Sequence, residues 1–79
     1  MEMIPVVSSN VKAIGWAGNQ LIMDSGIVRD ILRVEYLHGA IYDYLNVSKE
    51  VYDRLFASES KGSFINREIK PRYQSLRIN

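Results

Sequence analysis

The 79-residue chain contains no cysteine, a single histidine and only two prolines. The absence of cysteine excludes disulfide bonds, thiolate nucleophiles and thiolate-bound metals, and it fits a reducing cytoplasm. No apolar run approaches the roughly 20 residues that a membrane-spanning helix needs, and no signal peptide opens the chain. We therefore expect a cytoplasmic protein with no membrane partner.

Sequence patterns typical of enzymes are also missing. The chain has no glycine-rich phosphate loop, no metal-ligand spacing and no nucleophile elbow. Its one histidine, His38, adjoins Gly39 between two strand-like segments, which is typical of a solvated turn residue. We expect a non-enzymatic protein that needs no cofactor and no metal.

Charge is close to balanced overall but uneven along the chain. The net charge is +1, and residues 61–79 hold five basic side chains against Glu68 alone. These five are Lys61, Arg67, Lys70, Arg72 and Arg77. The basic end predicts either a polyanionic partner or a solvated segment that keeps a small protein soluble.

A chain of this length forms one domain, here residues 1–79. Apolar alternation predicts strands over 11–16, 27–37 and 40–47, and turn-forming residues stand at 17–19 and 24–26. Residues 73–79 are compatible with an edge strand or a loose tail. Three to four antiparallel strands are therefore expected.

Two helices are expected after the strands. Ser48 is a good N-cap, and Val51, Tyr52, Leu55 and Phe56 then recur at helical spacing. A short second helix would carry Ile65 and Ile69 and end at Pro71, because the residue before proline disfavours helical angles. The predicted fold class is α+β: a small antiparallel sheet with one amphipathic helix and a short second helix packed on one face.

The register of the central hairpin decides where the tyrosines point. A two-residue loop at His38-Gly39 would pair Val34 with Asp43 and place a carboxylate among apolar side chains. A loop of odd length centred on Gly39 instead pairs Tyr36 with Tyr42 and Val34 with Tyr44. We prefer the odd loop, which buries no charge, sets Asp43 near Arg33, and turns Tyr42 and Tyr44 toward the helix.

Four short motifs, in this order along the chain, resemble those of the KTSC domain. They are Ser8-Ser9, Gly15-Trp16, the pair Tyr42 and Tyr44, and the element formed by Ser60, Gly62, Phe64 and Asn66. The family takes its name from the C-terminal extension of some lysyl-tRNA synthetases and includes free-standing bacterial and phage proteins. The resemblance implies a small α+β domain without established enzymatic activity, for which RNA binding is suggested.

The segment 60–73 is the first candidate site. Lys61, Arg67, Lys70 and Arg72 could hold phosphate groups, and Asn66 could read a base edge or cap the backbone. Trp16, Tyr42 and Tyr44 are the rings that could stack on a base. Equally, Phe64, Ile65 and Ile69 could dock this segment on the sheet, with the tyrosines as core.

The second candidate lies in residues 17–30, where the KTSC resemblance implies a shorter polar connection. This apolar hairpin contains Leu21, Ile22, Met23, Ile27 and Val28. Exposed contiguous apolar surface usually marks an interface. We expect either a homo-oligomer or a host-protein partner here, with sequestration of a nucleotide signal between subunits as a variant, or a longer strand pair folded back on the core.

Overall fold

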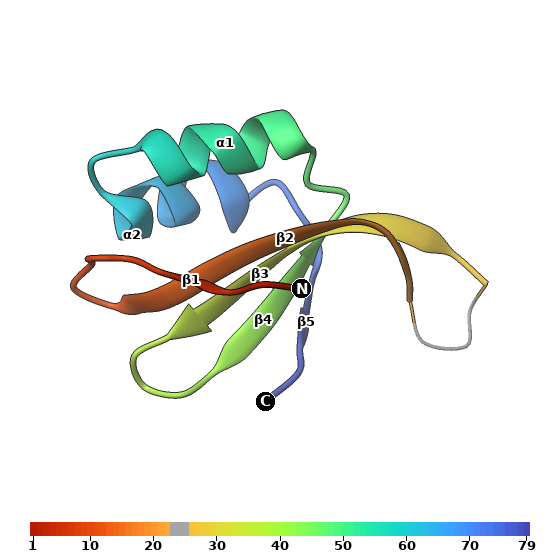
Figure 1. Cartoon of the computed structure of the whole chain (residues 1–79), viewed down its shortest axis with the longest axis horizontal. Helices are drawn as coiled ribbons and strands as arrows, with labels where there is room; N and C mark the ends of the chain where they lie inside the picture. Colours follow the sequence, from red (N-terminus) through yellow and green to blue (C-terminus); the bar gives the residue numbers. More distant parts are fainter. Residues whose placement is uncertain (23–25) are drawn as a thin grey trace.

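An antiparallel sheet carries a layer of helices on one face (Figure 1). The structure is a computed structural model that describes residues 1–22 and 26–79. In these residues five strands follow the order β1-β2-β3-β4-β5. The strands are β1 (Ile4–Pro5), β2 (Val11–Leu21), β3 (Val28–Tyr36), β4 (Ile41–Leu45) and β5 (Ser75–Arg77).

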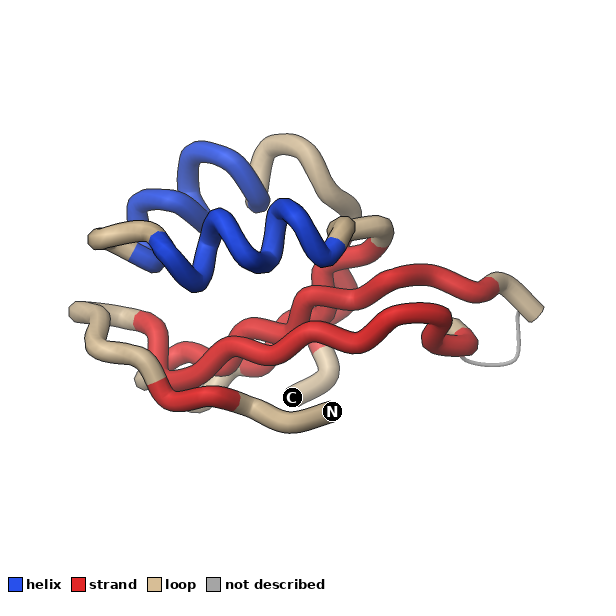
Figure 2. The backbone as a smooth tube through the Cα atoms, turned by 45° about the horizontal axis from the view of Figure 1, so that its top comes forward, coloured by secondary structure: helices blue, strands red, loops and turns tan. Residues whose placement is uncertain are grey.

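The helical layer consists of two consecutive pieces of helix beside α1, and all of it lies on the same side of the sheet (Figure 2). The bounds are α1 (Lys49–Ala57), α2 (Lys61–Phe64) and its π-helical continuation η1 (Ile65–Ile69). The predicted α+β class is confirmed. The predicted strand count is too low, because β1 and β5 are too short to carry an alternation that sequence reading can detect.

The turn predicted at residues 17–19 is wrong, since β2 runs through it. The register between β2 and β3 shifts between Ala17 and Gln20, which marks a β-bulge. Asn19 takes a positive φ of 55°, and its backbone N–H donates to Asp30 Oδ1 at 3.1 Å. Turn-forming residues are thus used here to bulge a strand, which then continues into the extended hairpin.

The β3–β4 loop has the predicted odd length, but it is centred on His38. Val34 pairs with Tyr42, and Leu32 pairs with Tyr44, so the predicted partners are wrong by two residues. Gly39 is the last loop residue; its φ of 102° lets its N–H donate to the Tyr36 carbonyl at 3.0 Å. A shift of two keeps every side chain on its face, so both tyrosines still point toward the helices.

Serine caps and one close contact fix the helices. The hydroxyl of Ser48 accepts from the Val51 N–H, and that of Ser60 accepts from the Ser63 N–H. A side chain at Gly62 would lie 2.6 Å from Asn10 Oδ1, so glycine allows α2 to approach the loop before β2. η1 ends before Pro71 as predicted. The stated reason is wrong, however, because Lys70 itself retains helical angles.

The core fills the space between helices and sheet. Phe56, predicted in the buried stripe of α1, is 44% exposed, whereas Tyr52 and Leu55 of the same helix are buried. The buried cluster consists of Val11, Ile14, Leu32, Val34, Tyr36, Tyr44, Val47, Tyr52, Leu55, Phe64, Ile65 and Ile69. None of the helices in the described residues is long and apolar enough to cross a membrane.

Candidate functional site

A hollow of about 330 Å³ opens where the β3–β4 turn, the β4–β5 pair and the end of η1 meet. It is lined by His38, Tyr42, Tyr44, Lys70 and Ser75, and we call it the tyrosine hollow. Its residues come from segments far apart in the sequence, which the register of β4 with β5 brings together through the pair Tyr44–Ser75.

The rings of the tyrosine hollow form a continuous cluster. His38 stacks on Tyr36 with ring centres 5.5 Å apart, and Tyr42 meets the same Tyr36 ring edge-on at 6.0 Å. Tyr44 lies 6.4 Å from Tyr42 between ring centres. Tyr42 is the partly buried member, and Tyr44 is buried. The hollow therefore offers an aromatic surface backed by the core.

The hydroxyls beneath this surface are neutral at physiological pH. The hydroxyls of Tyr36 and Tyr44 lie 3.0 Å apart and share one hydrogen bond. Burial raises the pKa of both phenols above the ordinary value of 10.0. The pair accordingly provides a fixed polar contact and no charge.

Two cations lie over these rings. Lys70 Nζ is 5.5 Å from the centre of the Tyr36 ring, and Arg77 Cζ is 5.9 Å from that of Tyr42. The N–H of Lys70 donates to the Ile65 carbonyl at 2.8 Å, an i to i+5 bond that widens the last helical turn. Of the two cations, Lys70 lines the tyrosine hollow, and Arg77 lies beside it over the ring of Tyr42.

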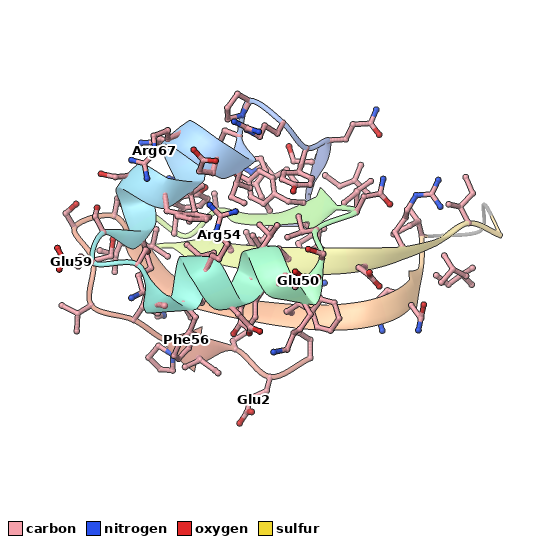
Figure 3. All side chains as sticks on the ribbon, turned by 90° about the horizontal axis from the view of Figure 1, so that it is seen from above. Glu2, Glu50, Arg54, Phe56, Glu59 and Arg67 are labelled. Carbon is pink, nitrogen blue, oxygen red and sulfur yellow. The ribbon has the colours of Figure 1, made fainter. Side chains whose placement is uncertain are left out.

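The other predicted phosphate ligands lie elsewhere. Arg67 and Arg72 both pair with Glu68, at 3.4 and 3.7 Å, and Lys61 Nζ donates to the Ser58 carbonyl at 2.7 Å. Figure 3 shows Arg67 extending outward from the helical layer. Asn66 is exposed. None of these four side chains lines the tyrosine hollow.

Trp16, predicted as a stacking ring, has a structural contact. Its indole N–H donates to the Val47 carbonyl at 2.7 Å, and the partly buried ring packs against the core. This hydrogen bond ties β2 to the segment that leads into α1. Of the three candidate rings, the structure brings only Tyr42 and Tyr44 to the hollow.

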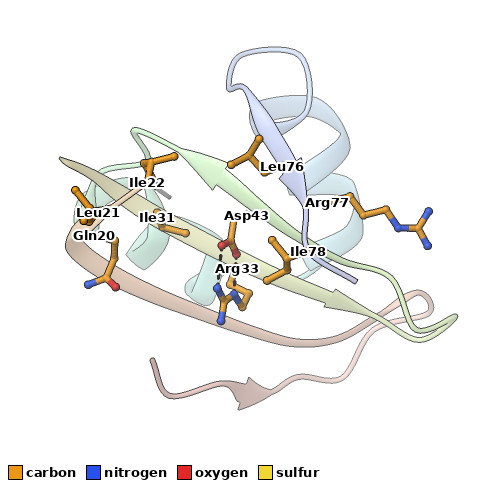
Figure 4. A pocket seen from close by; sticks show the side chains of 9 residues that line it. All are labelled: Gln20, Leu21, Ile22, Ile31, Arg33, Asp43, Leu76, Arg77 and Ile78. Atoms are coloured by element: carbon orange, nitrogen blue, oxygen red, sulfur yellow. Dashed lines mark hydrogen bonds and ion pairs between the residues drawn. The ribbon is translucent and has the colours of Figure 1, made fainter. Parts of the chain in front are cut away.

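The opposite face of the sheet carries a second depression, of about 370 Å³, which we call the open-face groove (Figure 4). At its centre the Arg33 guanidinium donates two hydrogen bonds to the Asp43 carboxylate, at 2.7 and 2.9 Å. This pair raises the pKa of Arg33, mainly through the side-chain hydrogen bond. Aliphatic side chains surround it: Leu21, Ile22, Ile31, Leu76 and Ile78.

The open-face groove bears on two predictions, the exposure of Asp43 and the position of the apolar interface residues. Asp43 faces Arg33 as predicted, but it is buried, with 6% of its surface exposed, so the hairpin does bury a charge. Of the predicted interface residues, Leu21, Ile27 and Val28 are 61%, 44% and 48% exposed, and Ile22 lines the groove. Met23 lies outside the described residues.

Comparison with known proteins identifies the family. The model of the KTSC domain matches residues 28–73, more than half of the chain. The chain belongs to the KTSC domain family. A protein of Tsukamurella paurometabola is 36% identical over 76 residues, which cover 96% of this chain and all of that protein. An uncharacterized protein of Stutzerimonas stutzeri is 31% identical over the full length of both.

A solved structure has the same fold. The crystal structure of a KTSC domain protein from Yersinia pestis superposes with a TM-score of 0.79 at 25% identity, covering 99% of this chain and 97% of that one. The KTSC match contains His38, Tyr42, Tyr44 and Lys70 but ends before β5. The outer wall of the tyrosine hollow therefore comes from a strand beyond the matched region.

Sequence reasoning missed Ser75 and Arg77. His38 is the exposed turn residue that the sequence predicts, and its ring also stacks on Tyr36. Ser75 lines the hollow and Arg77 lies over the Tyr42 ring only because β5 pairs with β4, which places Arg77 opposite Tyr42. The sequence signal for β5 is the alternation of residues 75–77, which is too short to predict a strand by itself.

Proposed function

We propose that this KTSC domain is a non-enzymatic cytoplasmic module that binds nucleoside phosphates, presented as single-stranded RNA or as a free nucleotide. The observation that carries the proposal is that Lys70 lines one hollow with His38, Tyr42 and Tyr44, while Arg77 lies over the Tyr42 ring. Aromatic faces and cations side by side are what single-stranded nucleic-acid sites combine.

The hollow suits a single nucleotide unit. Its volume of about 330 Å³ lies at the lower end of small-ligand pockets, and a duplex could not enter it. Tyr42 and His38 supply rings for a base, and Lys70 and Arg77 supply charge for a phosphate. Arg72, 66% exposed at its side chain, lies two residues beyond Lys70 and can contact a neighbouring phosphate of a longer strand.

Three further observations support the proposal. The resemblance to the synthetase-associated members of the family points to RNA, and the absence of cysteine fits the reducing cytoplasm in which RNA and nucleotides are met. The ion pairs of Arg67 and Arg72 with Glu68 are solvent-exposed and therefore weak, so a phosphate can compete for either arginine.

The experiment is a salt titration of fluorescent single-stranded RNA, read by anisotropy. Binding should weaken as salt rises, and the slope of log K against log salt should lose roughly 0.7 for each phosphate contact removed in Lys70→Gln or Arg77→Gln. Lys12→Gln is the matched control, because Lys12 is 62% exposed on β2 and does not line the hollow.

Competition with unlabelled mononucleotides separates the two sources of the ligand. Displacement by a mononucleotide as strong as by the oligomer indicates a nucleotide-binding protein, and displacement by the oligomer alone indicates RNA. Absence of binding by both, binding that ignores salt, or an equal loss in Lys12→Gln would each reject the proposal.

A protein-interaction role is the second candidate. It is favoured by one observation: Leu21 and Val28 stay more than two fifths exposed although both lie in regular strands. Such residues in a hairpin that extends past the helices are typical of an interface. The partner under this second candidate is a host protein or another copy of the chain.

A further inference from the structure

The open face of the sheet is a mixture of aliphatic and charged side chains. By strand alternation, β3 and β4 present Ile31, Ile41 and Leu45 on the face away from the helices, together with the charged residues Arg29, Arg33, Glu35 and Asp43. A face that stays in water in an antiparallel sheet is normally polar. The three aliphatic residues are therefore the feature that asks for a partner.

The aliphatic rim of the open-face groove remains exposed in the single chain. Leu76 is 37% exposed and Ile78 45%, and Leu21 at the hairpin end is 61% exposed. Figure 4 shows these side chains arranged around the Arg33–Asp43 pair, with the guanidinium of Arg77 pointing away from it. The rim therefore offers apolar contacts on several sides of one paired charge.

We propose that a second copy of this chain covers the open-face groove, forming a two-fold symmetric dimer whose axis passes beside the Arg33–Asp43 pair. The inference rests on the second candidate function and specifies its partner. It is independent of the tyrosine hollow, which opens on the helix-covered face.

Charge complementarity is the first argument for a second copy. On a two-fold axis beside this pair, the Arg33–Asp43 pairs of the two copies meet in opposite directions, so the positive end of each approaches the negative end of the other. Arg33 makes the approach, because Asp43 itself is only 6% exposed. Arg33 uses two of the five N–H donors of its guanidinium on its own Asp43, and its side chain is 33% exposed toward the groove. Within residues 1–22 and 26–79 its side chain bonds to no other group, so donors remain for a partner's carboxylate.

Area is the second argument. A stable interface buries about 800 Å² on each partner. This chain exposes 4976 Å² in total, so about one sixth of its surface would suffice. The exposed aliphatic side chains of Leu21, Val28, Leu76 and Ile78 would lie within that area.

The first test measures native mass by light scattering across a hundredfold range of concentration. The unchanged chain should approach the dimer mass. Leu21→Ser and Leu76→Ser should each raise the dimer dissociation constant by about tenfold or more, because each substitution occurs twice per dimer. Leu37→Ser is the matched control, since Leu37 is 57% exposed at the β3–β4 turn, away from the groove.

The second test examines the central charges. A chain with Arg33→Asp and Asp43→Arg keeps its internal pair and should dimerise with itself. Mixed with the unchanged chain it should form no heterodimer in native mass spectrometry, because like charges would then meet across the axis.

These outcomes decide the inference independently of RNA binding. A monomer at every concentration, or a dimer whose dissociation constant is unchanged by Leu21→Ser and Leu76→Ser, would overturn the inference. Heterodimers between the unchanged and the swapped chain would show that the two-fold axis does not pass beside the Arg33–Asp43 pair. If the swapped chain does not fold, the serine variants still decide. RNA binding by Leu21→Ser, measured by anisotropy, separates the two proposals. If this variant loses the dimer but still binds RNA, the dimer and the RNA site at the tyrosine hollow are independent.

Discussion

The two faces of the sheet are stabilised in different ways by the same strands. Beneath the helices, Leu32 and Val34 are fully buried, and the polar pair Tyr36–Tyr44 is neutral. On the other face the centre is the ion pair Arg33–Asp43, and aliphatic side chains around it remain exposed. One side is a completed core, and the other is a partly exposed surface of mixed aliphatic and charged side chains.

The difference follows from the period of two along a strand. Within residues 31–36 and 41–45, odd-numbered positions carry the charges, and even-numbered positions carry the core residues and tyrosines. Because Ile31, Ile41 and Leu45 also occupy odd positions, the sheet has an apolar layer on one face, a mixed layer on the other, and helices over only the first. Substitutions matched across the sheet can test whether the layers differ as much as this arrangement implies.

The largest expected effect comes from truncating the same residue type on either face. Leu32→Ala should reduce the free energy of unfolding by about 3 kcal/mol, because Leu32 is fully buried and leaves a cavity beneath the helices. Leu76→Ala should cost less than about 1 kcal/mol, since water already reaches that side chain. Urea unfolding of both variants, at a concentration where the chain is monomeric, provides the measurement. Equal losses would mean that the open face is as well packed as the core.

The next effect concerns the charged centre of the open face. Arg33→Met should destabilise the monomer by about 2–3 kcal/mol, because Asp43 would remain buried without its partner; partial exposure of Arg33 keeps the loss below that of a fully buried pair. Adding Asp43→Leu to Arg33→Met should restore most of the loss. The comparison is again made by urea unfolding, and a double variant as unstable as Arg33→Met would show that the pair itself, rather than the orphaned carboxylate, is the stabilising element.

Sequence reasoning predicted most of the fold and the sides on which these residues lie. Three features were predictable because local chemistry or periodicity determines them: the cap at Ser48, the spacing of Ile65 and Ile69, and the odd length of the β3–β4 loop. The register was wrong by two residues, since both registers keep the same faces and only the closing bonds around Gly39 distinguish them.

The candidate sites were less predictable than the fold. Lys70 was among the chosen cations, but nothing local indicates that it lies over a ring of β3 while Arg67 points from the helical layer. Arg77 comes to lie over the Tyr42 ring through pairing between β5 and β4, a contact between segments that are distant in the sequence. The open-face groove was likewise not predictable, because Leu76 lies in a strand too short to be recognised from its alternation and Ile78 directly follows that strand.

A third effect distinguishes the two faces at alkaline pH. Burial raises the pKa of Tyr36, Tyr44 and Tyr52, all on the helix side, above the 10.0 of an exposed phenol. The unfolded chain therefore loses phenolic protons above pH 10 while the folded chain retains them, so stability present below pH 10 falls as pH rises. Each tyrosine can contribute up to about 1.4 kcal/mol per pH unit.

Urea unfolding on either side of pH 10 measures this slope. The double variant Tyr36→Phe with Tyr44→Phe should lose stability less steeply with pH than the unchanged chain, because two of the responsible phenols are gone. If the free energy of unfolding falls equally steeply with pH in both chains, groups other than Tyr36 and Tyr44 cause the alkaline loss of stability. The two faces would then not differ in their response to pH through these tyrosines.

The smallest effect tests whether the hydroxyl pair of the core behaves like the ion pair of the open face. Tyr44→Phe should cost about 1 kcal/mol, because the Tyr36 hydroxyl is left without its buried partner, and adding Tyr36→Phe should recover part of that cost. Tyr42→Phe is the matched control: its ring belongs to the same cluster, and the removed hydroxyl takes no part in the Tyr36–Tyr44 bond.

Coupling energies from this cycle and from the Arg33–Asp43 cycle can be compared directly, since both pairs bridge β3 and β4. We expect the ionic pair to couple more strongly, because an orphaned charge is harder to bury than an orphaned hydroxyl. The reverse ranking would mean that the open face tolerates a lone charge as solvent does, and that its centre needs no second chain to cover it.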